Sequence, residues 1–271
     1  MKKAVVLWLI YRKLRPALGI SVAFILLSGV FLGVFNMSLV MAALGFFFIE
    51  LFGAFYNDYS DFPEDIRNNR KDKFTTCRII STKTCLDWSV IFAMVGFVFL
   101  FFTNYLLMFL GIFYLFLMYL YSNKKVHLKG RISGYLILSS PFLLLPPFVA
   151  VMNGSPLLMA LPLSLFFFLQ YMYILCQKDS TDPADKKNPF KTCGWKRATG
   201  IATLFAVSAS IPLLFICIQN PYLIIVWAFN VTIKFTNLYH ISKRTITRSL
   251  RGRIILLEYL TPYIYFAGGI L

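Results

Sequence analysis

The chain has 271 residues and a formal net charge of +16 at pH 7, although only 14% of its residues are charged. A soluble domain carries about a quarter charged residues, and 59% of this chain is hydrophobic, so its composition excludes an ordinary soluble protein. The five cysteines form no Cys-x-x-Cys pair, which argues against a metal–thiolate site and favours reduced, packed thiols.

Apolar segments follow one another along the whole chain, and about 20 helical residues suffice to cross the hydrocarbon core of a membrane. Nine spans are expected, at 17–36, 39–59, 87–103, 105–122, 133–152, 156–178, 196–217, 220–240 and 252–271. Because these segments recur up to the C-terminus, the first of them does not read as an isolated signal peptide. The sequence therefore predicts an all-α, polytopic membrane protein with nine transmembrane helices, in which residues 1–271 form a single transmembrane domain.

The positive charges all fall on one side of this layout. With the N-terminus inside, the inner segments are 1–16, 60–86, 123–132, 179–195 and 241–251. These segments and the adjoining helix ends hold all 27 Lys and Arg residues, and the outer connections hold none. Since positive residues favour the cytoplasmic side, the N-terminus and the inner loops are predicted to be cytoplasmic. A basic face against anionic lipid explains the net charge without nucleic acid.

Most of the acidic residues lie in two of the inner stretches. They are Asp58, Asp61, Glu64, Asp65 and Asp72 in loop 60–86 and at its edge, then Asp179, Asp182 and Asp185 in loop 179–195. The two stretches, NDYSDFPEDIRNNRKDKFTTC and KDSTDPADKKNPFKTC, resemble each other and are separated by four spans. This spacing is consistent with two four-helix repeats followed by a ninth helix.

The first acidic stretch has the spacing of a metal site at a helix end. Asn57, Asp61 and Asp65 are four residues apart and share one face of a helix. Oxygen ligands of this kind suit Mg²⁺, which commonly completes its shell with water or substrate phosphate. Pro63 is expected to kink or end the helix, which makes Asp65 the least certain ligand.

The second acidic stretch is similar, with Asp179 and Asp182 on one helical face, Pro183 expected to end the helix, and Asp185 on the loop. Cations surround both stretches: Arg67, Arg70, Lys71, Lys73, Lys178, Lys186, Lys187 and Lys191. Carboxylates with bound metal, ringed by Lys and Arg, form a diphosphate clamp. The alternative is two solvated loops with surface salt bridges, each worth about 1 kcal/mol or less.

Four motifs in chain order carry a resemblance to a known family. Residues 57–65 match the pattern NDxxDxxxD, and residues 178–182 match the pattern KDxxD. Residues 121–124 match YxxK at the inner end of the fourth span, and Arg-Pro precedes the first span at 15–16. The chain thus resembles the UbiA superfamily of intramembrane prenyltransferases along its whole length, including the nine-span layout.

This resemblance implies an enzyme that uses Mg²⁺ to move a prenyl group from an allylic prenyl diphosphate to a lipophilic acceptor in the membrane. The implied metal ligands are Asn57, Asp61, Asp65, Asp179, Asp182 and Asp185. The implied diphosphate contacts are Arg70, Lys73, Lys124, Lys129 and Lys178. The catalytic candidates are Asp61, Asp182 and Tyr121. The second motif departs from the family pattern, because Asp182 and Asp185 have one residue fewer between them.

Several residues inside the spans are candidates for a site that holds the acceptor or the prenyl cation. Tyr121, Tyr171 or Tyr173 could present a π-face to the cation, or could simply anchor the helices at the membrane interface. Glu50 lies on nearly the same face as Asn57 and about 10 Å deeper. It could accept the acceptor's proton, or be a protonated carboxyl with internal hydrogen bonds. The same two alternatives apply to Glu258 in the last predicted span.

The residues leave three functions open. The first is prenyl transfer to an aromatic or quinone precursor or to a glycerol-phosphate ether, the second is a UbiA-type terpene cyclase, and the third is a non-enzymatic lipid carrier. The expected partners are the prenyl diphosphate, the acceptor and the lipid bilayer. No nucleic acid and no obligate protein partner are expected.

Overall fold

The fold was analysed in a computed structural model, in which every regular element is a helix among the residues that it describes. The described residues are 6–7, 9–11, 13–14, 17–33, 35–67, 73–123, 125–126, 128–129, 131–152, 154–180, 189–218, 221–247, 250, 253–254, 257–258, 261 and 263–264. The chain divides into two compact units. The first consists of Met1–Val22 and Asn36–Leu128, and the second of Ala23–Phe35 and Lys129–Leu271.

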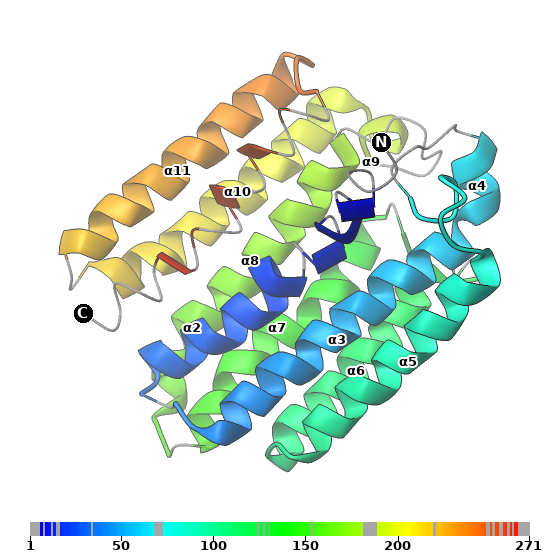
Figure 1. The fold of residues 1–271 in the computed structure, drawn as a ribbon. Coiled ribbons are helices and arrows are strands. Elements are labelled where there is room, and N and C mark those ends of the chain that lie inside the picture. The colour runs from blue at the N-terminus through cyan, green and yellow to red at the C-terminus, as the bar shows by residue number, and fades with distance from the viewer. Residues whose placement is uncertain are drawn as a thin grey trace. The chain divides into compact units, whose positions relative to one another are not determined.

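The first unit is built around one long helix that packs against three others. Its elements are η1 (Ala17–Val22), α3 (Met37–Ser60), α4 (Phe62–Arg67), α5 (Thr82–Phe101) and α6 (Tyr105–Ser122). Helix α3 packs most extensively on α5, and also on α6 and η1 (Figure 1). Its C-terminal end leads directly into the short helix α4, and therefore into the first aspartate motif.

Short polar residues set where the helices of the first unit begin. The side chains of Asn36, Ser81 and Asn104 accept hydrogen bonds from the first-turn amides of α3, α5 and α6. Such N-caps satisfy amide groups that have no partner within the helix. The Asn104 amide also donates to the Ser38 hydroxyl at 3.0 Å, which links the start of α6 to that of α3.

Two glycines let α3 and α5 approach closely. A Cβ atom added at Gly96 would lie 3.0 Å from the Gly45 carbonyl oxygen, and one added at Gly45 would lie 2.7 Å from the Leu100 side chain. Helices in membranes commonly pack through small residues, because apolar contact alone does not distinguish protein from lipid. These glycines therefore fix the crossing that carries the first motif.

The second unit has six helices. They are α2 (Ala23–Phe31), α7 (Ile132–Met152), α8 (Leu157–Ser180), α9 (Pro189–Thr192), α10 (Trp195–Cys217) and α11 (Pro221–Ser242). Helix α8 packs between α7 and α10, and α10 packs on α11 (Figure 1). Helix α2 is held on this group by Phe24, whose ring stacks on that of Phe167 at 4.2 Å and meets that of Phe142 edge-on at 5.4 Å.

The helices match the predicted spans at most positions. Six of them, α3, α5, α6, α7, α8 and α10, are long and apolar enough to cross a membrane, among the residues described. The first predicted span appears as η1 and α2, and the eighth as α11. Large apolar side chains such as those of Phe101 and Leu158 are exposed, as lipid-facing residues are. The chain is an integral membrane protein.

Two features of the predicted layout differ from the structure or lie beyond its description. The predicted loops 60–86 and 179–195 contain two short helices, α4 and α9, that were not predicted separately from the sequence. Most of the ninth span, 252–271, lies outside the described residues. The count of nine transmembrane helices, the single domain and the repeated four-helix unit therefore stay predictions.

Candidate functional site

The first aspartate motif lies where α3 ends and α4 begins. Helix α3 stops at Ser60, and α4 starts at Phe62 with Pro63 in its first turn, where a missing amide is tolerated. The expected break therefore occurs, but at Asp61, two residues ahead of Pro63, and the chain resumes a helix through Pro63 and Asp65. The Asp61 amide still donates to the Asn57 carbonyl at 3.0 Å, and the Asp65 amide to the Asp61 carbonyl at 2.9 Å. These two bonds keep the three motif positions one helical turn apart across the break.

The two carboxylates of this motif are withdrawn from the surface. Asp61 is 8% exposed and Asp65 is 5% exposed, whereas Asn57 is half-buried. The Ser60 hydroxyl donates to the Asp61 carboxylate at 3.5 Å. Buried carboxylates are costly unless cations or hydrogen bonds balance them. The motif therefore offers concentrated negative charge that a divalent cation would neutralise.

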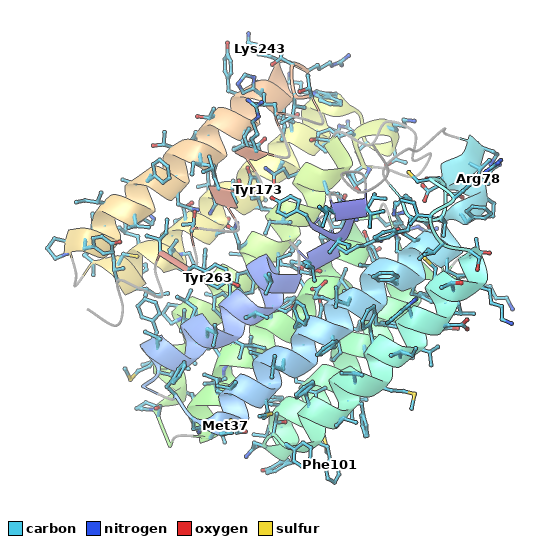
Figure 2. The ribbon with its side chains drawn as sticks, viewed as in Figure 1. Met37, Arg78, Phe101, Tyr173, Lys243 and Tyr263 are labelled. Atoms are coloured by element: carbon cyan, nitrogen blue, oxygen red, sulfur yellow. The ribbon has the colours of Figure 1, made fainter. Side chains whose placement is uncertain are left out.

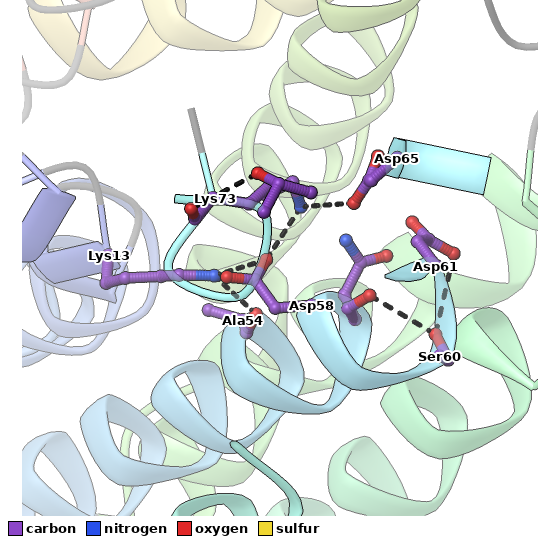
Figure 3. Close-up of polar contacts among 9 residues, drawn as sticks. Lys13, Ala54, Asp58, Ser60, Asp61, Asp65 and Lys73 are labelled. Carbon is purple, nitrogen blue, oxygen red and sulfur yellow. Dashed lines mark hydrogen bonds and ion pairs between the residues drawn. The ribbon is translucent and has the colours of Figure 1, made fainter. Parts of the chain in front are cut away.

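Asp58 organises the positive charge beside these carboxylates (Figure 3). Its carboxylate is fully buried, and one oxygen lies 2.7 Å from the ammonium groups of both Lys13 and Lys73. The Lys13 ammonium also donates to the Ala54 carbonyl at 2.6 Å, and Lys73 lies 3.9 Å from an oxygen of Asp65. The predicted phosphate contact Lys73 is therefore brought directly to the motif.

Lys13 is a member of this cluster that the sequence did not point to. It precedes the first apolar segment, and only its contact with Asp58, 45 positions along the chain, marks it. Burial lowers the pKa of Lys13 from 10.5 to about 8, against the opposing effect of the Asp58 carboxylate. Two lysines and the carboxylates of Asp58, Asp61 and Asp65 leave a formal net charge of −1, which suits binding of a metal cation before an anionic substrate.

The second motif begins at the end of α8, which stops at Ser180. Asp179 is 4% exposed, and its carboxylate accepts a hydrogen bond from the hydroxyl of the fully buried Tyr135 on α7. Tyr135 was not predicted, because nothing in its local sequence marks a residue that meets Asp179 only through the packing of α7 on α8. The other two predicted ligands, Asp182 and Asp185, lie outside the described residues.

The remaining predicted phosphate contacts are only partly described. Lys178 is exposed at the end of α8, and Lys129 is half-buried in the loop before α7. Arg70 and Lys124 lie outside the described residues. Within the described ranges, no three His, Cys, Asp or Glu side chains form a group that could hold a metal ion. The described oxygen donors nevertheless fit a hard cation such as Mg²⁺, which binds through few carboxylates and keeps other ligands from water or phosphate.

The three candidate tyrosines have separate surroundings. Tyr121 is buried at the C-terminal end of α6. The Tyr171 ring meets that of Phe142 on α7 at 4.8 Å. The hydroxyl of Tyr173, which is labelled in Figure 2, accepts a hydrogen bond of 2.8 Å from the Asn237 side chain on α11. Although they belong to one helix, Tyr171 and Tyr173 therefore contact different neighbours and do not form one site.

Glu50 is buried in α3 and is hydrogen-bonded inside the first unit. One of its carboxyl oxygens accepts a bond of 3.0 Å from the Ser21 hydroxyl and another bond from the Tyr114 hydroxyl. This geometry matches one of the two predicted alternatives for Glu50, a carboxyl with internal hydrogen bonds. A role for Glu50 toward the acceptor stays a prediction.

Fold and site together define a class. The chain is a multi-pass helical membrane protein in which two 24-residue helices, α3 and α8, each end at an aspartate motif flanked by lysines. Its sequence matches the UbiA prenyltransferase family over residues 17–251. The protein belongs to the UbiA prenyltransferase family and is a prenyltransferase.

Solved structures share this fold at low sequence identity. The UbiA homologue from Aeropyrum pernix K1, in its apo form, is 14% identical, with a TM-score of 0.74 over 95% of this chain and 98% of that one. The Archaeoglobus fulgidus UbiA homologue bound to GPP and Mg²⁺ is 15% identical, with a TM-score of 0.68 over 96% and 99%. A digeranylgeranylglyceryl phosphate synthase is 18% identical, with a TM-score of 0.63 over 99% and 98%. No curated protein matches the sequence.

Proposed function

We propose that the protein transfers a prenyl group from an allylic prenyl diphosphate to a lipophilic acceptor inside the membrane, with Mg²⁺ as cofactor. The observation that carries this proposal is the first motif, where two buried carboxylates lie beside a lysine that a third carboxylate holds in place. Negative charge for a cation and positive charge for a phosphate occur within one cluster. Solvated loop residues would not be buried in this way.

The metal ligands follow from the two motifs. Asn57, Asp61 and Asp65 would hold one Mg²⁺, and Asp179 with Asp182 and Asp185 would hold another. When bound, Mg²⁺ neutralises the charge that develops on the diphosphate as it leaves. The hydroxyl of Tyr135 orients the Asp179 carboxylate for this role, as hydrogen bonds to ligands do at many metal sites.

The lysines supply the remaining charge. Lys73 contacts the diphosphate from its place between Asp58 and Asp65, with Lys13 held behind it. Arg70, Lys124, Lys129 and Lys178 are the further candidates for phosphate contacts. The apolar walls of the helices keep water from the prenyl cation. Tyr121, Tyr171 or Tyr173 would stabilise the cation with a π-face, and Glu50 is the candidate group for the acceptor's proton.

The acceptor falls into one of two classes, an aromatic or quinone precursor or a glycerol-phosphate ether. The Archaeoglobus fulgidus homologue was solved with GPP and with DMAPP, each together with Mg²⁺, which supports an allylic diphosphate as the donor. Similarity to digeranylgeranylglyceryl phosphate synthase is consistent with the second acceptor class, but it holds at 18% identity and so reflects the fold.

The test is an assay of purified protein with geranylgeranyl diphosphate, Mg²⁺ and a mixture of candidate acceptors. Pyrophosphate release that needs both Mg²⁺ and an acceptor supports the transferase. Release with a cyclic hydrocarbon and no acceptor would show a terpene cyclase, and no metal-dependent release with any donor length would leave the lipid carrier.

Replacing Asp61 by Ala removes a metal ligand at the end of α3, so kcat/KM for pyrophosphate release should fall at least about a hundredfold. The matched control is Asp87→Ala, because Asp87 is an exposed carboxylate on α5 of the same unit. The control should retain activity. Full activity in Asp61→Ala would contradict the assignment of the motif.

A further inference from the structure

The second unit contains a buried polar cluster that the aspartate motifs do not explain. We define it by Tyr173 and Gln177 on α8, Lys234 and Asn237 on α11, and Glu258 in the C-terminal segment. None of these five side chains is more than 2% exposed. Ionisable groups inside membrane-spanning structure are costly, and they commonly mark a site for a substrate or an ion.

The five side chains converge on one place. The Asn237 amide donates to the Tyr173 hydroxyl at 2.8 Å and so joins α11 to α8. Tyr173 and Gln177 are one turn apart on α8, and Lys234 and Asn237 are one turn apart on α11. Glu258 interacts electrostatically with Lys234 and lies beside both Tyr173 and Gln177.

Much of the hydrogen-bonding capacity of this cluster is unused. Both carboxylate oxygens of Glu258, both amide atoms of Gln177 and the side-chain oxygen of Asn237 are buried and make no hydrogen bond of ordinary distance and angle in the described part of the chain, although Glu258 is close enough to Tyr173 and Gln177 to interact weakly with both. The Lys234 ammonium has a single long bond, 3.4 Å to the Ser210 hydroxyl, and faces the Phe166 ring at 5.8 Å. Buried polar atoms are nearly always paired, so this many open ones indicate a bound polar group.

The charges of the cluster indicate what kind of group it would take. Lys234 and Glu258 balance each other, so the site offers donors and acceptors without net charge. A hydroxyl group can donate to Glu258 and accept from Gln177 at the same time. A phosphate would bring further negative charge beside Glu258, at a depth where charge is poorly screened.

We infer that this cluster binds the polar head group of the acceptor, and that this head group is uncharged and carries hydroxyl or carbonyl groups. The inference rests on the proposed prenyl transfer and selects its aromatic or quinone class of acceptor. The cluster lies at nearly the same level of α8 as the second motif, although Gln177 and Asp179, two residues apart, point to different faces of that helix. Gln177 and Tyr173 precede Asp179 by two and six residues, which places them about 3 and 9 Å from it along the helix axis.

The experiment measures KM for each substrate separately in purified protein. The acceptors are an uncharged naphthohydroquinone and, for comparison, geranylgeranylglyceryl phosphate, with geranylgeranyl diphosphate as the donor. In Gln177→Met and Glu258→Gln, KM for the hydroquinone should rise about tenfold or more, because a hydrogen bond to the head group is lost. KM for the diphosphate should change less than about twofold.

A binding measurement checks the same site without turnover. The hydroquinone should raise the Tm of the unmodified protein, and this increase should be lost in Gln177→Met. The matched control is Gln170→Met, since Gln170 is a buried glutamine two turns earlier on α8 and outside the cluster. The control should keep both the Tm increase and the KM for the hydroquinone.

The outcomes separate this inference from the proposed function. Failure of the unmodified protein to bind or cleave the diphosphate with Mg²⁺ would overturn both. Transfer that prefers geranylgeranylglyceryl phosphate would overturn the inference alone. Variants with a lower Tm but unchanged KM values for both substrates would also overturn the inference alone. The cluster would then hold only water, or would stabilise the packing of α11 and the C-terminal segment.

Discussion

At the scale of single residues, Asp58 holds the positively charged lysines beside the first motif. It belongs to the run Asn57-Asp58, but it does not share the helical face of Asn57 and Asp61, and its carboxylate is fully buried between two lysines. Removing one partner from such a buried pair commonly costs about 3–5 kcal/mol, because the other charge is left uncompensated. Asp58 therefore serves the site by holding Lys13 and Lys73 rather than by binding metal.

Burial of Lys13 makes the free energy of unfolding depend on pH. Burial lowers the pKa of Lys13 to about 8 in the folded protein, from 10.5. Between these two values the unfolded chain holds a proton that the folded chain has released, so stability rises with pH. Relative to Lys13→Met, the free energy of unfolding should increase by about 1 kcal/mol per pH unit above pH 8. Chemical unfolding of both proteins at pH 7.5, 8.5 and 9.5 measures this, and a constant difference would contradict it.

The hydroxyl of Tyr135 leads to a prediction for the second motif. Tyr135→Phe removes the hydrogen bond to Asp179 and keeps the buried ring in place. Residues that orient a metal ligand in this way are worth about 10- to 100-fold in metal affinity. Titration of the activity with Mg²⁺ should show a decrease of that size in apparent affinity. Tyr239→Phe, which removes an exposed hydroxyl from α11, is the control and should leave the Mg²⁺ titration unchanged.

At the scale of elements, the two motifs depend on where two long helices end. Helices α3 and α8 have 24 residues each, and each carries its first aspartate in the last turn. In the described chain, α3 gives way to α4 at Asp61, ahead of Pro63, and α8 extends to Ser180. Small shifts of either helix along its axis would move the carboxylates by a similar distance.

The glycine contact between α3 and α5 should therefore be sensitive to added volume. Gly96→Ala places a Cβ atom 3.0 Å from the Gly45 carbonyl oxygen, a backbone atom that cannot move alone. Such overpacking typically costs about 1–3 kcal/mol. Thermal unfolding in detergent should show the loss as a lower Tm. Gly200→Ala is the matched control, because a Cβ atom there meets nothing within 4 Å, and it should leave the Tm unchanged or slightly higher.

Helix positions followed from the sequence because the bilayer imposes a length and an apolar composition on each span. The predicted span at 105–122 coincides with α6, and the one at 133–152 differs from α7 by one residue. Contacts between residues that are far apart in the sequence could not be predicted from it. Lys13 and Tyr135 reach Asp58 and Asp179 only through folding, and neither sits at a spacing that a helical pattern would show. The motifs pointed to the candidate ligands but not to Lys13 and Tyr135, which contact the motif residues in the folded protein.

At the scale of the whole molecule, the proposed chemistry requires both motifs to face the same side of the membrane. Two cysteines can report on this, because Cys77 lies in loop 60–86 and Cys193 in loop 179–195, and both are half-buried. The other cysteines, Cys85, Cys176 and Cys217, are buried. Variants that keep only Cys77 or only Cys193 therefore place one label beside each motif.

In intact cells, a membrane-impermeant maleimide should label neither single-cysteine variant, and permeabilisation should expose both, since the positive charges predict that both loops are cytoplasmic. Phe102→Cys in a cysteine-free background is the control, because Phe102 is exposed at the C-terminal end of α5, which is predicted to lie outside, and it should be labelled from outside. Labelling of Cys77 and Cys193 from opposite sides would separate the two motifs by the bilayer. No single diphosphate could then bind to both, and the proposed transferase would lose its metal site.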